Sequence, residues 1–207
     1  MGKSARLRAQ RKKAERVPLS QLMEAVIAIG DRFGTAPRCT EAACLLEHAG
    51  RKLGYKLTLR PVSVLAVDTS TNSIAFMGQK VTAMLSPEDR ARAIDHRPGG
   101  AGDTGHVVVT CEDPSMLFDP NLRQLGSYGI DAPSVALRIS STHPEDGQWT
   151  FSHKDLRVYY LLDDDNLGLL ANYDTISKAW EAEAADLVRL IRAGATADDI
   201  ARGLARA

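Results

Sequence analysis

Two segments near the start of the chain carry hydrophobic residues at helical spacing. In residues 19–33 the apolar side chains recur on one face of a helix, and Gly34 and Pro37 end the pattern. A second pattern with a wide apolar face covers residues 39–53, and Gly54 follows it as a common C-terminal stop. We therefore expect two amphipathic helices that pack on the body of the protein.

The middle of the chain carries short apolar or alternating runs that are typical of strands. Residues 56–67 are rich in β-branched side chains, with Pro61 at a bulge or an edge. Residues 106–111 (HVVVTC) predict a buried strand, and residues 116–118 a short one. Further strands are expected at residues 74–77, 135–139, 149–151, 156–162 and 167–173.

The last two of these strands are expected to form a hairpin that turns at residues 163–166, and helices complete the chain. One helix is expected from about Asp174 to Ala193, and the other is capped by Thr196 with Asp199 three residues on. The order of helices, antiparallel strands and further helices indicates an α+β fold.

The charged residues are unevenly distributed, although 26 Lys and Arg balance 26 Asp and Glu. The first sixteen residues hold seven of the bases and one of the acids, which leaves 19 bases and 25 acids in the body. We expect residues 1–17 to be a disordered basic tail that makes at most a weak contact with nucleic acid. The body is expected to comprise one domain, residues 18–173, and a helical extension, residues 174–207.

The expected location is the cytoplasm. The sequence has no apolar run long enough to cross a membrane, and its N-terminus lacks the apolar stretch of a signal peptide. Three cysteines are an odd number for a disulfide framework, so we expect reduced thiols.

One cysteine, one histidine and one aspartate follow each other in contexts that suit nucleophilic catalysis. Cys39 opens a predicted helix, where free backbone N–H groups and the helix dipole stabilise a thiolate. His106 begins a buried strand that can hold its ring rigidly against that helix end. Asp119 ends the neighbouring strand, thirteen residues later, where a carboxylate can orient the imidazole.

The segments around these residues resemble the transglutaminase-like superfamily of cysteine enzymes. The segment from Cys39 to Leu46 (CTEAACLL), with Leu53-Gly54 closing the helix, is similar to the nucleophile helix of that family. Gly105-His106-Val107 is similar to its histidine strand, and Phe118-Asp119-Pro120 to its hydrophobic-Asp-Pro segment. The resemblance covers residues 34–126 and implies a papain-like core.

The resemblance also implies an activity. It implies a cysteine hydrolase or acyltransferase, similar to a thiol protease, that acts on a protein or peptide-like substrate through a thioester, with Cys39, His106 and Asp119 as its triad. The implied reactions are amide hydrolysis, deamidation and transglutaminase-type transfer. The family often has an aromatic residue shortly after the histidine, where this chain has only valines, and its substrate class does not carry over. No metal or other cofactor is expected.

Several residues keep other interpretations. Asn121 or Asp113 could orient His106 in place of Asp119, and Cys44 and Cys111 fit a buried core. A zinc site is disfavoured because no Cys-x-x-Cys pair exists. His96, His143 and His153 fall in polar segments and are expected to face solvent, and the glycines of residues 97–105 suggest a mobile lid beside the site.

Two other functions remain open. In one, the fold is kept as an interaction module without catalysis. In the other, the basic tail is the working part and binds nucleic acid.

Overall fold

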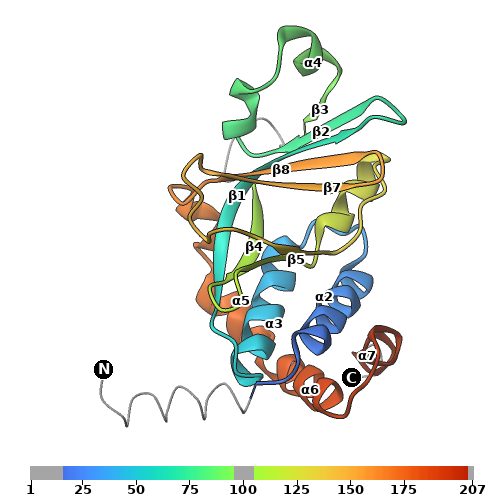
Figure 1. The fold of residues 1–207 in the computed structure, drawn as a ribbon, viewed down its shortest axis with the longest axis vertical. Helices are drawn as coiled ribbons and strands as arrows, with labels where there is room; N and C mark the ends of the chain where they lie inside the picture. The colour runs from blue at the N-terminus through green and yellow to red at the C-terminus, as the bar shows by residue number, and fades with distance from the viewer. Residues whose placement is uncertain (1–15, 96–104, 205–207) are drawn as a thin grey trace.

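The computed structural model describes residues 16–95 and 105–204. The described strands form one sheet of eight, which is almost entirely antiparallel, and helices cover one side of it (Figure 1). The chain therefore has an α+β fold. The first fifteen residues of the expected basic tail, and all of the expected lid except Gly105 (residues 97–104), lie outside the described residues.

Strand β1 (Leu57–Asp68) organises the sheet because three other strands pair with it. Its first half, Leu57 to Val62, pairs with β4 (His106–Cys111), and its second half pairs with β2 (Ser73–Met77) and β8 (Leu156–Leu162). The order through the sheet is β3-β2-β1-β4-β5-β6, and β7 lies on β8. The remaining strands are β3 (Ile94–Asp95), β5 (Met116–Asp119), β6 (Val135–Arg138) and β7 (Gln148–His153).

Pro61 lies inside β1 rather than at a bulge or an edge. It faces Val107 of β4, and its carbonyl accepts a hydrogen bond from the N–H of Asp163 at 3.0 Å. The missing N–H of a proline interrupts only one ladder bond, so the strand continues through it.

Helices from both ends of the chain share one core. That core joins α2 (Leu19–Phe33) and α3 (Cys39–Lys52) with α6 (Glu181–Arg192) and α7 (Ala197–Leu204), and β4 and β5 add Val107, Val109 and Phe118. In Figure 1 these helices gather on one side of the sheet. The short elements η1 (Lys80–Ala83) and α4 (Pro87–Arg92) lie at the opposite end of the molecule.

The predicted strand at residues 167–173 and the hairpin before it are wrong. Strand β8 pairs with β7 and β1, and residues 167–170 form a 3-10 helix, η4 (Leu167–Leu170). Asp163, in the expected turn, is buried. Its carboxylate accepts a hydrogen bond from the Ser63 hydroxyl at 3.1 Å and pairs with Lys80 at 3.2 Å. These contacts come from distant parts of the chain, so the local sequence does not report them.

The predicted helix from Asp174 to Ala193 is interrupted at Trp180. It consists of α5 (Tyr173–Ala179) and α6, and the Trp180 ring packs edge-on against Phe33 with centroids 5.3 Å apart. The cap of the last helix is confirmed, because Thr196 and Asp199 exchange side-chain to backbone hydrogen bonds. The predicted limits of α2, α3 and β4 are also confirmed, to within one residue.

Candidate functional site

The register between β4 and β5 brings His106 and Asp119 to the same end and the same face of the sheet. Val109 is opposite Phe118, so Asp119 is opposite Val108, two residues from His106. Side chains two residues apart on a strand share a face, so both polar side chains point the same way.

The His106 ring and the Asp119 carboxylate form a buried hydrogen bond. Nε2 of His106 lies 2.8 Å from Oδ2 of Asp119, and both side chains are fully buried. The same oxygen accepts a hydrogen bond from the hydroxyl of Tyr160 at 3.0 Å. Oδ1 accepts one from the backbone N–H of Asn121, also at 3.0 Å. Three hydrogen-bond partners, the His106 ring, the Tyr160 hydroxyl and the Asn121 N–H, therefore hold the carboxylate of Asp119.

Cys39 lies beside the same ring at the first residue of α3. The preceding segment is fixed against the site, because the Asn121 side chain donates to the carbonyl of Ala36 at 3.0 Å. Cys39 interacts with His106 both through charge and as a side-chain hydrogen-bond partner. Cys39 is only partly buried, whereas the other two cysteines are buried.

The electrostatics of this group favour a protonated ring. Burial alone lowers the pKa of His106, but the negative charge of Asp119, followed by that of Cys39 and by the hydrogen bonds to both, raises it to about 10. Burial and the charge of Asp119 raise the pKa of Tyr160 well above its ordinary value. Tyr160 therefore keeps its proton and remains a donor to the carboxylate.

Two further residues of the site were missed by the sequence analysis. Gln124 places its side-chain nitrogen 2.6 Å from Nδ1 of His106, and Tyr160 reaches Asp119 from β8. The only sequence feature that points to Gln124 is its position five residues after Asp119. It belongs to the short helix η3 (Leu122–Tyr128). Tyr160 lies 41 residues beyond Asp119, in a strand whose pattern indicates only an ordinary core position.

The alternative partners of His106 have other contacts. Asp113 pairs with Arg16 at 3.4 Å, and Asn121 supports Asp119 through its backbone and Ala36 through its side chain. Cys44 and Cys111 are buried in the core, as predicted.

The remaining histidines and acids form no metal cluster in the described part of the chain. His143 and His153 are exposed, as predicted, and His96 lies outside the described residues. No three His, Cys, Asp or Glu side chains among residues 16–95 and 105–204 come together in an arrangement that could hold a metal ion.

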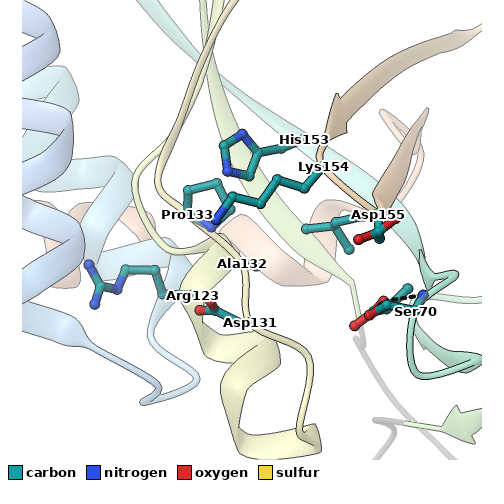
Figure 2. Close-up of a pocket in the computed structure, with 10 residues that line it drawn as sticks. Ser70, Arg123, Asp131, Ala132, Pro133, His153, Lys154 and Asp155 are labelled. Atoms are coloured by element: carbon teal, nitrogen blue, oxygen red, sulfur yellow. Dashed lines mark hydrogen bonds between the residues drawn. The ribbon is translucent and has the colours of Figure 1, made fainter.

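A surface cavity of about 280 Å³ is lined by residues outside the triad (Figure 2). It lies between the segment after η3 and the turns that follow β1 and β7. Its lining mixes charges from Arg123, Asp131, Lys154 and Asp155. None of Cys39, His106 or Asp119 lines it.

A larger cleft of about 670 Å³ lies at the C-terminal end of α3, the end opposite Cys39. It is lined by five cationic side chains and one acidic one, Glu47; the cations are Arg16, Arg51, Lys52, Lys56 and Arg192. Since α3 has 14 residues, its two ends are separated by roughly 20 Å.

Comparisons with known proteins assign no family. No family model, curated protein or solved structure matches this chain. Among the helices of the described residues, none is both long and apolar enough to cross a membrane.

Proposed function

We propose that this chain is a cysteine-dependent acyl-transfer enzyme with a papain-like, transglutaminase-like core. The observation that carries the proposal is the buried His106 ring, which Asp119 holds at Nε2 and which interacts with Cys39. A nucleophile at a helix start, a base in contact with it and a carboxylate that orients the base are the parts that thiol catalysis requires.

In the proposed reaction, the thiol proton of Cys39 first passes to Nδ1 of His106, which gives a thiolate and an imidazolium. The sulfur then attacks the carbonyl carbon of an amide or ester. The carbonyl oxygen gains the negative charge and accepts a hydrogen bond from the Cys39 backbone N–H at the start of α3. The bond to the leaving group then breaks, His106 returns the proton to that group, and a thioester remains. Water or an amine gives a proton to His106 and releases the acyl group.

Asp119 keeps the ring in a productive state through these steps. By accepting the Nε2–H hydrogen bond, it leaves Nδ1 as the nitrogen that exchanges protons, and its charge stabilises the imidazolium. Tyr160 and the Asn121 N–H hold the carboxylate in place. Because these supporting groups and the ring are buried, the base is shielded from water, while Cys39 at the start of α3 is only partly buried.

Acylation by an activated ester tests the proposal directly. The protein is incubated with p-nitrophenyl acetate, and the acyl group is located by peptide mass spectrometry. We expect acetylation of Cys39 that hydroxylamine reverses and that Cys39→Ser abolishes. Cys44→Ser, a substitution on the same helix, should leave the acetylation unchanged. Acylation that persists in Cys39→Ser, or that is equal in His106→Ala, would contradict the proposal.

A second candidate function is favoured by the cationic cleft at the far end of α3. Arg16 lines that cleft and directly follows the basic residues of the tail in the sequence. The cleft and the tail can therefore contact the same polyanion. Binding of single-stranded RNA should then fall steeply with salt, and deletion of residues 1–16 or the pair Lys52→Glu and Lys56→Glu should weaken it. Salt-independent or absent binding would remove this candidate.

A further inference from the structure

The side chain of Gln124 contacts Nδ1 of His106, the ring nitrogen that exchanges protons in the proposed reaction. Its side chain is almost fully buried, and its Nε2 lies 2.6 Å from Nδ1 of His106. The same Nε2 lies 3.3 Å from Sδ of Met77, at the end of β2. An amide nitrogen carries two hydrogens, and here each has one acceptor: a ring nitrogen and a thioether sulfur.

Donation from Gln124 has a definite consequence for the ring. Nδ1 accepts the hydrogen bond only when it carries a lone pair, which is the case in the neutral imidazole whose proton is on Nε2. A protonated Nδ1 would instead place its own N–H against the amide N–H groups. Turning the amide over would bring its oxygen to Nδ1, but that oxygen would then also face the sulfur of Met77, which has no hydrogen to donate.

The backbone fixes Gln124 in this position. Helix η3 passes against the loop before Cys39, since a Cβ at Gly126 would lie 2.7 Å from Cγ2 of Thr35. The Asn121 amide at the start of η3 also holds Ala36 of that loop. Gln124 is therefore held between the base and the segment that positions the nucleophile.

Gln124 and Asp119 act on the ring in opposite directions. Asp119 favours the imidazolium, whereas an amide donor on Nδ1 favours the neutral ring. A base whose proton is held too tightly returns it slowly to a leaving group, and general acid–base catalysis works best when both forms are accessible near the working pH. An opposing donor on Nδ1 keeps the neutral form accessible.

We propose that Gln124 is a positioning residue of this site: its amide holds Nδ1 of His106 and favours the neutral thiol–imidazole form of the Cys39–His106 pair. The inference rests on the proposed function, in which Nδ1 exchanges its proton with Cys39. It supplies a role for a residue outside the predicted triad.

The pH profile of Cys39 alkylation by iodoacetamide tests this role. Gln124→Met keeps the size of the side chain but removes the donor, so the thiolate–imidazolium pair should form at lower pH. Loss of one neutral hydrogen bond predicts an acid midpoint about one pH unit lower, or about tenfold faster alkylation on the acid limb. Gln124→Glu, which places an acceptor on Nδ1–H, should move the midpoint further in the same direction. Gln148→Met on β7, whose amide contacts Asp146, is the control and should leave the profile unchanged.

The outcomes separate this inference from the proposed function. If Cys39 alkylation in the wild type does not depend on His106, the proposed function fails. If it depends on His106 but the midpoints of the Gln124 variants equal that of the wild type, or move upward, only the role of Gln124 is overturned.

Wild-type protein labelled with ¹⁵N gives a test that needs no substitution. At a pH above the titration of the ring, a scalar coupling across the hydrogen bond between Gln124 Nε2 and His106 Nδ1 is expected. A neutral ring that carries its proton on Nδ1 would overturn the inference.

Discussion

The hydroxyl of Tyr160 lies 3.0 Å from Oδ2 of Asp119, the same carboxylate oxygen that faces the His106 ring. Tyr160 is fully buried on β8, and its hydroxyl keeps its proton because burial and the charge of Asp119 raise its pKa well above the ordinary value. Strand β8, which pairs with β1, therefore contributes directly to the orientation of Asp119 and of the His106 ring.

Tyr160→Phe should weaken the site while preserving the fold. Removing one hydrogen bond to a buried charge costs about 1.5–3 kcal/mol of unfolding free energy. We expect this loss in denaturant unfolding, together with slower acylation of Cys39. Tyr159→Phe is the matched control on the same strand, because successive strand residues face opposite sides. Equal effects of the two substitutions would show that Tyr160 acts only as a core side chain.

Asp119→Asn should lower the pKa of His106, because it removes the negative charge that opposes the effect of burial. In the wild type the charge of Asp119 helps to raise the pKa of the ring from 6.5 to about 10, against a burial that lowers it. Without that charge the pKa of the ring should fall, because burial still lowers it, so the ring becomes neutral at a lower pH. Ring titration by NMR measures the change. Asp163→Asn, which alters another buried carboxylate, should leave the His106 titration unchanged.

The three cysteines should differ widely in reactivity. Burial, followed by the charges of nearby acids, raises the pKa of Cys44 to about 12, and burial also raises that of Cys111. Both side chains are shielded, whereas Cys39 is half-buried. Iodoacetamide at neutral pH should therefore modify Cys39 at least about tenfold faster than the other two thiols. His106→Ala should slow this reaction, and equal slow labelling of all three would contradict an activated nucleophile.

Asn121→Ala should loosen the segment that positions Cys39. The lost amide bond to the Ala36 carbonyl predicts a cost of about 1 kcal/mol in stability and a larger relative loss in acylation rate. Ser134→Ala is the control, because the Ser134 hydroxyl contacts the carbonyl of Pro120 and not the loop before Cys39. An acylation rate unchanged in a folded Asn121→Ala protein would show that the loop needs no such support.

The local sequence determined the parts of this protein that depend on neighbouring residues. The 3.6-residue period of apolar side chains defined α2 and α3, and the run of valines after His106 defined β4. Glycine and proline marked the ends of the helices. These signals also placed Cys39 at a helix start and His106 and Asp119 on successive strands, and the meeting of the last two follows from the antiparallel pairing of those strands.

Only the tertiary structure decided which distant residues complete the site. Tyr160 reaches Asp119 because β8 pairs with β1 rather than with a following strand, and Gln124 reaches His106 because η3 folds back against the loop before Cys39. The same long-range contacts bury Asp163 and end α5 at Trp180, where the local pattern predicted a hairpin tip and a continuous helix. Periodicity reports which face of an element is buried, but not what covers that face. Contacts between elements far apart in the chain therefore become visible only once the sheet order is set.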